Sequence, residues 1–260
     1  MEKRNKIILL IILIVLFFSV NYSFLDKKLE KFLINYETAI VERIIDGDTV
    51  VINKNSVRLL GINSPERGEK YYGEAKEFLE KEIFNRTVRL EFGKEKEDLY
   101  GRILAYIFLG LDNVNLKLVE EGLANFYFPQ GKDIHYNEFK EAWEKCIENN
   151  KNLCEKSKDK CAKCIELKTL DFKSQEVVFY NKCNFQCELT SWEIKDEGRK
   201  KFIFPEFLLN SNSRVKIKVN EGINDKENLF WENEEYVWTD TGDTLFLRDD
   251  SNKLVLWRSY

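Results

Sequence analysis

The stretch "IIDGDTVVI", residues 44–52, places two carboxylates, Asp46 and Asp48, around one glycine between two runs of β-branched residues. Acidic residues are poor strand formers, so the pattern indicates a turn between two strands. Asp-Gly between hydrophobic runs is a strong hairpin signal, because glycine readily adopts the positive φ that tight turns require. A solvated turn explains this stretch by itself, and any function for its carboxylates depends on segments elsewhere in the chain.

The size and charge of the chain narrow the classes of protein it can belong to. Its 260 residues, 43% of them hydrophobic, are enough for one large or two ordinary domains, and they do not indicate disorder. The formal net charge is -4 with both signs mixed, which excludes a basic protein that coats nucleic acid. If nucleic acid is a partner, a local groove must supply the positive potential, with help from a bound cation.

The N-terminus carries an uninterrupted apolar run over residues 7–20, preceded by Lys3, Arg4 and Lys6. A helix over this run would span about 21 Å, less than the roughly 30 Å hydrocarbon core of a bilayer. We predict that residues 1–26 are a signal peptide or a membrane anchor, since no clear small-x-small cleavage site follows. In both cases the rest of the chain is exported, either secreted or held on the extracellular side of the membrane through this N-terminal helix.

Export affects how the cysteines are interpreted. An even number of cysteines in an oxidising compartment predicts disulfides, whose pairing the sequence leaves open. The spacing Cys-x-x-Cys followed by Cys-x-x-x-Cys could also supply four thiolates to zinc, although disulfides are favoured. All six cysteines lie within one segment: Cys146, Cys154, Cys161, Cys164, Cys183 and Cys187.

Hydrophobic periodicity divides the exported part into two regions. Strand-like runs and three helical faces indicate a small α+β barrel unit over residues 37–156, with Asp133 as the expected N-cap of the third helix. The strand runs are 39–45, 49–52, 57–62, 87–92 and 103–109, and the helices are 72–85, 113–123 and 133–149. After a Cys- and Lys-rich linker, residues 157–164, short strands and Asn, Asp and Gly turns over residues 165–260 are typical of a separate β-sandwich domain.

Two segments downstream of Asp48 complete a motif set: "VRLLGINSPE", residues 57–66, and "DLYGRILAY", residues 98–106. In order and spacing, residues 39–156 resemble the staphylococcal-nuclease-like, or thermonuclease, family. The resemblance implies an oligonucleotide-binding-fold (OB-fold) barrel with three helices. It also implies a calcium-dependent nuclease that hydrolyses phosphodiester bonds of DNA, with RNA left open as a second substrate, to 3′-phosphate products.

The residue types also suit this chemistry. Phosphodiester hydrolysis requires an oriented or deprotonated water and neutralisation of charge in the transition state. A guanidinium forks onto two phosphate oxygens and stays charged. By the resemblance, Arg58 and Arg102 take this role and Glu66 is the general base or water-orienting carboxylate. Tyr100 and Tyr127 are candidates to contact nucleic acid, because stacking on an aromatic ring tolerates any base.

The same resemblance implies a calcium (Ca²⁺) site formed by Asp48, Asn63 and the backbone carbonyl of Ser64. Asn63 departs from the aspartate of the family, and a neutral amide lowers the charge of the ligand set. Losing this formal charge weakens calcium binding by about 1–3 kcal/mol, which raises the dissociation constant by about ten- to a hundredfold. A weakened site is still useful outside the cell, where extracellular calcium sites have dissociation constants of about 10⁻⁴ to 10⁻³ M. Asp46 could compensate for the missing charge through a bridging water.

The second region resembles the lamin-tail immunoglobulin-like fold through "LTSWEIKDEGRKKFIFP", residues 189–205, with Trp192 packed in its core, and "TDTGDTLFLRDDSNKLVLW", residues 239–257. An unrelated β sandwich is the alternative.

The only histidine, His135, is expected to be structural or solvated. The alternative function is a non-catalytic extracellular module that binds nucleic acid or associates with the envelope, its metal site being too weak for turnover. The sequence leaves the oligomeric state open.

Overall fold

The computed structural model describes residues 5, 8, 10–13, 15–19, 21 and 36–260. The described residues near the N-terminus are helical, and the predicted signal or anchor, residues 1–26, extends over positions outside the described set. Within the described part of the chain, no helix combines the length and the apolar character needed to cross a membrane.

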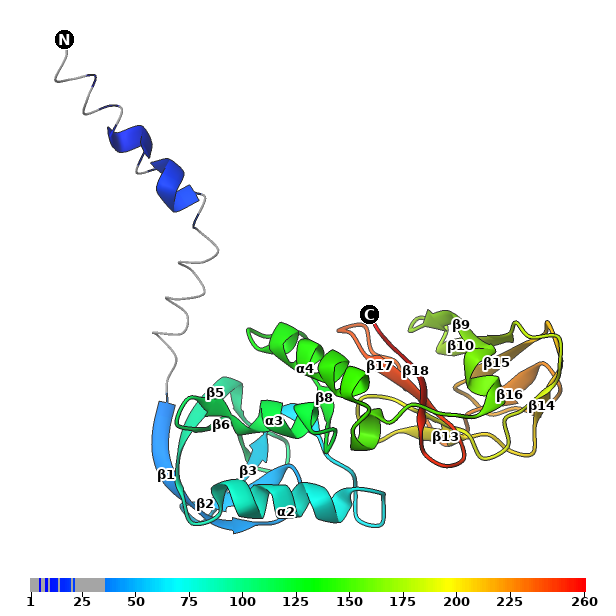
Figure 1. The fold of residues 1–260 in the computed structure, drawn as a ribbon, viewed down its shortest axis with the longest axis horizontal. Coiled ribbons are helices and arrows are strands. Elements are labelled where there is room, and N and C mark those ends of the chain that lie inside the picture. The colour runs from blue at the N-terminus through cyan, green and yellow to red at the C-terminus, as the bar shows by residue number, and fades with distance from the viewer. Residues whose placement is uncertain (1–4, 6–7, 9, 14, 20, 22–35) are drawn as a thin grey trace.

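A closed five-stranded barrel forms the first half of the described chain (Figure 1), as the sequence predicted. Neighbouring strands run antiparallel in the order β3-β2-β1-β5-β6, and a parallel pairing between β3 and β6 closes the barrel. Its strands are β1 (Tyr36–Ile44), β2 (Thr49–Ile52), β3 (Asn55–Leu59), β5 (Thr87–Glu97) and β6 (Ile103–Leu109), with β7 (Asp112–Asn113) beside β6. A separate antiparallel pair joins β4 (Gly61–Asn63) to β8 (Asn125–Tyr127).

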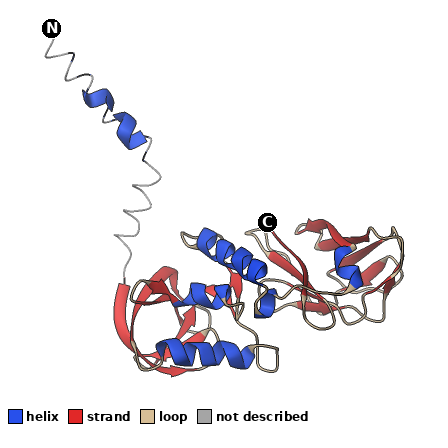
Figure 2. Cartoon of the chain, in the orientation of Figure 1, coloured by secondary structure: helices blue, strands red, loops and turns tan. Residues whose placement is uncertain are grey.

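Three α-helices belong to the barrel half (Figure 2), namely α2 (Tyr72–Ile83), α3 (Val114–Glu120) and α4 (Tyr136–Asn149). The prediction that Asp133 caps the third helix is wrong, because the N-cap position is His135. One oxygen of Asp133 accepts a hydrogen bond from the His135 backbone N at 2.9 Å, and the other accepts from the Tyr106 hydroxyl at 2.6 Å. The carboxylate therefore links the turn before α4 to strand β6.

The second half is built from strands in two four-stranded sheets, one in the order β16-β15-β10-β9 and the other in the order β13-β12-β17-β18. A short pair, β11 with β14, accompanies them. Trp192, Trp238 and Phe179 are buried in the core of this half, as a sandwich requires. The strands are β9 (Ile165–Asp171), β10 (Glu176–Asn181), β11 (Cys187–Glu188), β12 (Glu193–Lys195), β13 (Lys201–Ile203), β14 (Leu208–Leu209), β15 (Arg214–Lys218), β16 (Asn228–Phe230), β17 (Thr244–Arg248) and β18 (Leu254–Ser259).

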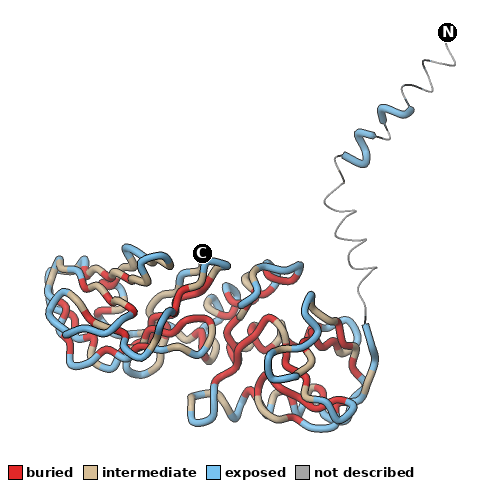
Figure 3. The backbone as a smooth tube through the Cα atoms, turned by 180° about the vertical axis from the view of Figure 1, so that it is seen from behind, coloured by how far each residue is buried: buried red, intermediate tan, exposed pale blue. Residues whose placement is uncertain are grey.

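Strands β17 and β18 contribute side chains to the core of the barrel half. Phe246 is fully buried and belongs to the same cluster as the barrel residues. Its ring packs edge-on against Trp143 of α4, with centroids 5.2 Å apart, and Trp257 packs against Phe126 of β8 at 6.0 Å. Buried backbone runs through both halves and along the contact between them (Figure 3). The two halves therefore share an apolar interface that positions the second half over β8 and α4.

All six cysteines form disulfides, so the zinc alternative is wrong. Cys146 pairs with Cys154, Cys161 with Cys187, and Cys164 with Cys183. The four cysteines that could have bound zinc instead join the start of the second half to Cys187 of β11 and to Cys183 in the segment before it.

The Cys161–Cys187 disulfide is expected to stabilise the fold measurably, because it joins residues 26 positions apart. Loop-closure entropy for that length amounts to about 3.5 kcal/mol. Replacing both cysteines with alanine should lower the free energy of unfolding by about 3 kcal/mol in denaturant titrations, and removing Cys146 and Cys154 should cost about 2.5 kcal/mol. An unchanged unfolding midpoint after loss of Cys161 and Cys187 would contradict this expectation.

Candidate active site

The Asp46–Asp48 turn packs against the loop after β4 and against helix α2. A Cβ on Gly47 would lie 2.6 Å from the Cβ of Ala75 and 2.8 Å from the Cβ of Ser64, closer than side chains approach. Only glycine permits this contact. Asp46 accepts a hydrogen bond from the Asp48 backbone N at 3.1 Å, which makes it a turn residue as well as a nearby carboxylate. The close approach brings the Asp48 side chain to Ser64.

Asp48 is buried, with 4% of its surface exposed, and both of its oxygens have partners. One oxygen accepts from the backbone N and from the hydroxyl of Ser64, each at 2.9 Å. The other lies 2.9 Å from an Arg58 nitrogen and accepts from the Thr49 hydroxyl at 3.1 Å. The predicted metal ligand is therefore held rigidly against the predicted phosphate-binding arginine.

Arg58 is also buried, with 7% exposure, and its guanidinium joins two predicted ligands. One amino group contacts the Asp48 carboxylate, and the other donates to the side-chain oxygen of Asn63 at 3.2 Å. Burial lowers the pKa of Arg58, and the charge of Asp48 opposes this effect. Oxygens of Asp48 and Asn63 therefore converge on one cationic group.

The second predicted arginine, Arg102, is oriented by the turn between β5 and β6. Its backbone N donates to one oxygen of Asp98 at 2.9 Å, and its Nε donates to the other at 2.7 Å. The backbone N of Tyr100 donates to the same carboxylate at 2.9 Å. Burial would raise the pKa of Asp98, but these hydrogen bonds outweigh it and lower the pKa. The ionised carboxylate thus fixes both Arg102 and the tyrosine beside it.

A cavity of about 430 Å³ brings together Arg58, Asn63, Tyr100, Arg102 and Tyr127. Asp48 and Ser64 are not among the residues that line it, and their contacts place them behind Arg58. Glu66 is not among them either. Five of the eight predicted catalytic, metal-binding and nucleic-acid-binding residues thus share one cavity. Of the other three, Asp48 contacts Arg58, and Ser64 donates to Asp48.

Glu66 forms an ion pair with a residue of the second half. Its carboxylate oxygen lies 2.7 Å from Nε of Arg199, and the two side chains are 47% and 60% exposed. Arg199 itself lines the cavity. The predicted general base is therefore connected to the cavity through Arg199 and remains accessible to solvent.

The connection between β12 and β13, residues 196–200, forms part of the cavity wall and was not predicted to be near the site. The Asn63 side-chain amide donates to the backbone carbonyl of Gly198 at 2.6 Å. The segment was recognised only as part of a fold motif, and nothing in its sequence relates it to position 63. Tyr236, Val237, Thr239 and Asp243 complete this side of the cavity.

Three carboxylates of the second half are buried beside the cavity. Burial and then repulsion by Asp243 raise the pKa of Asp196 to about 7 and that of Glu197 to about 8. Burial also raises the pKa of Asp243 to about 6. Glu197 accepts from the Phe128 backbone N at 3.0 Å, which attaches it to the barrel half. Because raised pKa values mean that the folded state holds extra protons, this cluster stabilises the fold less as the pH rises from about 4 through 8.

The residues expected to hold calcium supply oxygen donors of the right kind. The Asp48 carboxylate and the Asn63 amide oxygen already face a cation, the Arg58 guanidinium, at 2.9 Å and 3.2 Å. No group of three or more His, Cys, Asp or Glu side chains able to hold a metal ion occurs among the described residues. One carboxylate with neutral oxygens suits a hard cation bound weakly, in competition with Arg58.

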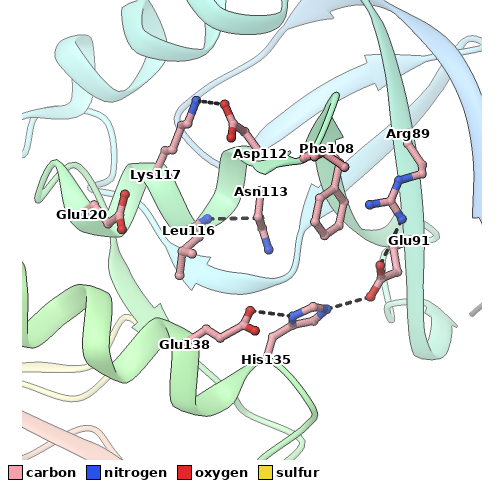
Figure 4. Close-up of a pocket in the computed structure, with 11 residues that line it drawn as sticks. Arg89, Glu91, Phe108, Asp112, Asn113, Leu116, Lys117, Glu120, His135 and Glu138 are labelled. Atoms are coloured by element: carbon pink, nitrogen blue, oxygen red, sulfur yellow. Dashed lines mark hydrogen bonds and ion pairs between the residues drawn. The ribbon is translucent and has the colours of Figure 1, made fainter. Parts of the chain in front are cut away.

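A larger cavity, of about 500 Å³, lies over β5, β6, α3 and the start of α4 and contains none of the predicted catalytic, metal-binding or nucleic-acid-binding residues (Figure 4). His135 is buried at its edge. Its Nε2 lies 2.7 Å from a Glu91 oxygen, and its Nδ1 lies 3.2 Å from a Glu138 oxygen. Of the two expectations for His135, structural or solvated, the structure shows the first.

The Glu91–His135 contact predicts a stability maximum between two pH limits. Burial would raise the pKa of Glu91 and lower that of His135, but their hydrogen bond and charges outweigh burial, so the Glu91 pKa is lowered and the His135 pKa is raised. The Glu91 contribution is present above pH 4.5 and lost as the pH falls through its lowered pKa. The His135 contribution is present below pH 6.5 and lost as the pH rises through its raised pKa.

We expect His135→Gln to lower the unfolding midpoint most between about pH 5 and 6.5, and to flatten its pH dependence. Denaturant titrations of both proteins across this range check the expectation. An equal loss of stability at every pH would show that His135 stabilises the fold by packing rather than by its charge.

Comparison with known proteins gives two family matches and several relatives. Residues 56–156 match the model described as Staphylococcal nuclease homologue, and residues 162–260 match the Lamin Tail Domain. The Thermonuclease of Staphylococcus intermedius is 44% identical over 108 residues, covering 37% of this chain and 64% of the relative. The Thermonuclease of Staphylococcus hyicus is 40% identical over 110 residues, covering 38% and 65%.

Endonuclease YncB of Bacillus subtilis is 36% identical over 107 residues, covering 37% of this chain and 51% of the relative. In these three comparisons, the chain thus spans less than two thirds of the relative's length. Each of the three alignments covers less than two fifths of this chain.

Proposed function

Since residues 56–156 belong to the staphylococcal nuclease homologues and residues 162–260 are a lamin tail domain, we propose that this chain is a nuclease. Its substrate is the phosphodiester bond of DNA or RNA, and its products carry 3′-phosphates. The observation that carries the proposal is the single cavity that joins Arg58, Arg102 and two tyrosines, with Glu66 one ion pair away.

The two arginines are suited to hold one phosphate. They come from different strands, β3 and the turn before β6, and both line the cavity. Guanidinium groups fork onto phosphate oxygens and stay charged, so they neutralise the negative charge that develops in the transition state. Their carboxylate partners, Asp48 and Asp98, fix their orientation before substrate arrives. Tyr100 and Tyr127 then provide rings for the adjoining base or sugar.

Glu66 is the proposed general base. Its ion pair with Arg199 is exposed at both ends, and such pairs contribute about 0–1 kcal/mol. Releasing the carboxylate to a water molecule therefore costs little. The carboxylate orients that water and takes its proton as the water oxygen attacks phosphorus. The bond from phosphorus to the 5′ oxygen breaks, the 5′ oxygen leaves with a proton from solvent, and the phosphate stays on the 3′ oxygen.

Calcium is the proposed cofactor. Asp48, Asn63 and the Ser64 carbonyl would hold it, and bound calcium would supply positive charge beside the reacting phosphate. Because the set has a single carboxylate, we propose a dissociation constant in the range of extracellular sites, about 10⁻⁴ to 10⁻³ M.

Asn63→Asp is expected to lower the calcium concentration required for half-maximal activity by about ten- to a hundredfold, since it adds a formal charge to the ligand set. Calcium titrations of hydrolysis by the two proteins provide the measurement. Asn55→Asp, at an exposed position of β3, is the matched control and should leave the requirement unchanged. Because the Asn63 amide also donates to the Gly198 carbonyl at 2.6 Å, thermal unfolding of the variant is measured beside the titration. A higher calcium requirement in a variant of unchanged stability would contradict the role of Asn63 as a ligand.

We also propose that the chain acts outside the cytosol. Three disulfides support this, because structural disulfides are typical of proteins in oxidising compartments.

The direct test is digestion of end-labelled single-stranded DNA by the purified chain with millimolar calcium, compared with chelator. The expected result is calcium-dependent cleavage, with 3′-phosphate ends identified by mass spectrometry. The neutral Asn63 favours one alternative, a module that binds nucleic acid without cleaving it. Binding without cleavage in any divalent metal would establish that alternative instead.

A further inference from the structure

We propose that a cavity lined by Arg248, Asn125 and three lysines, between the barrel and the lamin tail domain, binds a free phosphate ion. The cavity is separate from the proposed active site, because the two share no lining residue. The inference is independent of the proposed nuclease function, since the phosphate is a bound ligand here and takes part in no reaction.

Arg248 of β17 is a buried cation held by neutral oxygens. Only 3% of its surface is exposed, and one amino nitrogen donates to the backbone carbonyls of Leu153 at 2.7 Å and Asn252 at 3.4 Å. The other amino nitrogen is buried and has no hydrogen-bond partner among the described residues. Burial lowers the pKa of Arg248 to about 10, and the charge of Glu193 opposes this effect. Because a buried charge is costly unless it is paired, this guanidinium indicates that the cavity binds an anion.

The charged residues that line the cavity leave an excess of positive charge. The ammonium groups of Lys195 and Lys201 pair with Glu69 at 3.3 Å and 3.2 Å, and that of Lys201 also lies 4.0 Å from a Glu193 oxygen. Lys70 lines the cavity and is exposed to solvent. With the arginine of β17, four cations and two carboxylates line the cavity. The surplus of two positive charges equals the negative charge of monohydrogen phosphate.

A second group without a partner distinguishes phosphate from other dianions. Asn125 of β8 lines the same cavity with 5% of its surface exposed, and its side-chain oxygen has no hydrogen-bond partner among the described residues. Monohydrogen phosphate has oxygens that accept from Arg248 and one hydroxyl that donates to an amide oxygen, whereas sulfate has no hydroxyl. A phosphate ion therefore satisfies both groups, and sulfate leaves the amide oxygen unpaired.

The size of the cavity suits a free ion. Its volume is about 260 Å³, below the roughly 300–1,000 Å³ of pockets that enclose drug-sized ligands. The space takes one tetrahedral ion with a few waters, and it leaves little room for an attached nucleoside. Asn125 and Lys70 line it from the barrel half, and Arg248 and Lys195 line it from the lamin tail domain. A bound phosphate therefore joins the two halves and stabilises the folded chain.

Isothermal titration calorimetry of the purified full chain with inorganic phosphate, in chelator at constant ionic strength, measures the binding. Arg102→Met is the background for every variant, because it removes an arginine that the proposed active site offers to phosphate. On this background, Arg248→Met removes the buried cation, and Lys70→Gln removes an exposed cation of the lining. Lys81→Gln, at an exposed position of α2 outside the cavity, is the matched control.

We expect phosphate to bind in the Arg102→Met background, and sulfate to bind about tenfold more weakly. Arg248→Met should weaken phosphate binding by about tenfold or more, since hydrogen bonds to a charged group are lost. Lys70→Gln should weaken it by about two- to fivefold, and Lys81→Gln should leave it unchanged. In the unaltered chain, phosphate should raise the midpoint of thermal unfolding above its value in chloride of equal ionic strength.

A crystal structure of the unaltered chain with arsenate locates the site without any substitution, which decides the matter if Arg248→Met does not fold. Arsenate has the shape and the protonation of phosphate, and its anomalous scattering identifies it. We expect it within hydrogen-bond distance of Arg248 and Asn125. Thymidine 3′-monophosphate, which carries the phosphate of a nucleic-acid end, should bind this site more weakly than the free ion.

Unchanged phosphate binding in a folded Arg248→Met variant would overturn the proposal. Equal binding of sulfate would overturn the choice of phosphate, and tighter binding of thymidine 3′-monophosphate that depends on Arg248 would overturn the choice of a free ion. Arsenate found only at Arg58 and Arg102 would also contradict it. A chain that binds phosphate at Arg248 but cleaves no nucleic acid would contradict the proposed function and support this site.

Discussion

Glu66→Gln is expected to lower kcat on single-stranded DNA by about 10²–10⁴-fold, the usual contribution of a general base. The amide keeps the size of the side chain and can still accept a hydrogen bond from Arg199, but it cannot take a proton from water. Binding of the oligonucleotide should therefore remain within about threefold of the unaltered chain. Steady-state hydrolysis and anisotropy on the same preparations give the two quantities.

Glu77→Gln provides the matched control, since Glu77 lies on the exposed face of α2 outside the cavity. It should leave kcat unchanged. A Glu66 variant with nearly full kcat would show that water is activated by another group. A variant that loses binding rather than kcat would show that Glu66 acts through its contact with Arg199.

Arg58→Met and Arg102→Met are expected to differ in stability while losing similar activity. Each should reduce kcat/KM by about 10²–10³-fold, the cost of removing one group that stabilises transition-state charge. Arg58→Met should also cost about 3–5 kcal/mol of unfolding free energy, because it leaves the Asp48 carboxylate buried without its cation. Arg102→Met should cost about 1 kcal/mol or less, since its pair with Asp98 is partly exposed.

Denaturant unfolding and single-stranded DNA hydrolysis together check this contrast. Equal stability losses would mean that the buried Asp48 is satisfied by its bonds to Ser64 and Thr49. Full activity in either variant would remove that arginine from the phosphate site.

Local patterns predicted the barrel and most of its site because the residues that determine them are close in sequence. Gly47 of the first turn and Arg58 of β3 are 11 residues apart in the sequence. The pairing of β2 with β3 brings these two segments together. The three helices followed from their apolar spacing. Asp133 was misassigned because its carboxylate bonds to His135 and Tyr106 instead of capping the first turn of a helix.

Contacts between the halves could not be predicted in the same way. The hydrogen bond from Asn63 to Gly198 joins residues 135 positions apart, and no periodicity or spacing records it. Asn63 was therefore interpreted only as a weakened calcium ligand. The cysteine pairing was equally inaccessible, because six cysteines allow about 15 connectivities.

The shared core also changes which experiments are informative. Phe246 and Leu254 of the lamin tail domain are buried in the barrel cluster. Deleting residues 165–260 would expose apolar surface of Phe126 and Trp143. Lost activity in such a deletion would not separate catalysis from folding, so point variants of single cavity residues are the sharper test.

The most direct test of the proposed phosphate site is a crystal structure with calcium and a nucleoside 3′-phosphate, the proposed product. We predict one phosphate within hydrogen-bond distance of both Arg58 and Arg102, with Glu66 facing it and calcium against Asp48. A phosphate bound elsewhere, with Arg58 still engaged only by Asp48 and Asn63, would contradict the proposed mechanism.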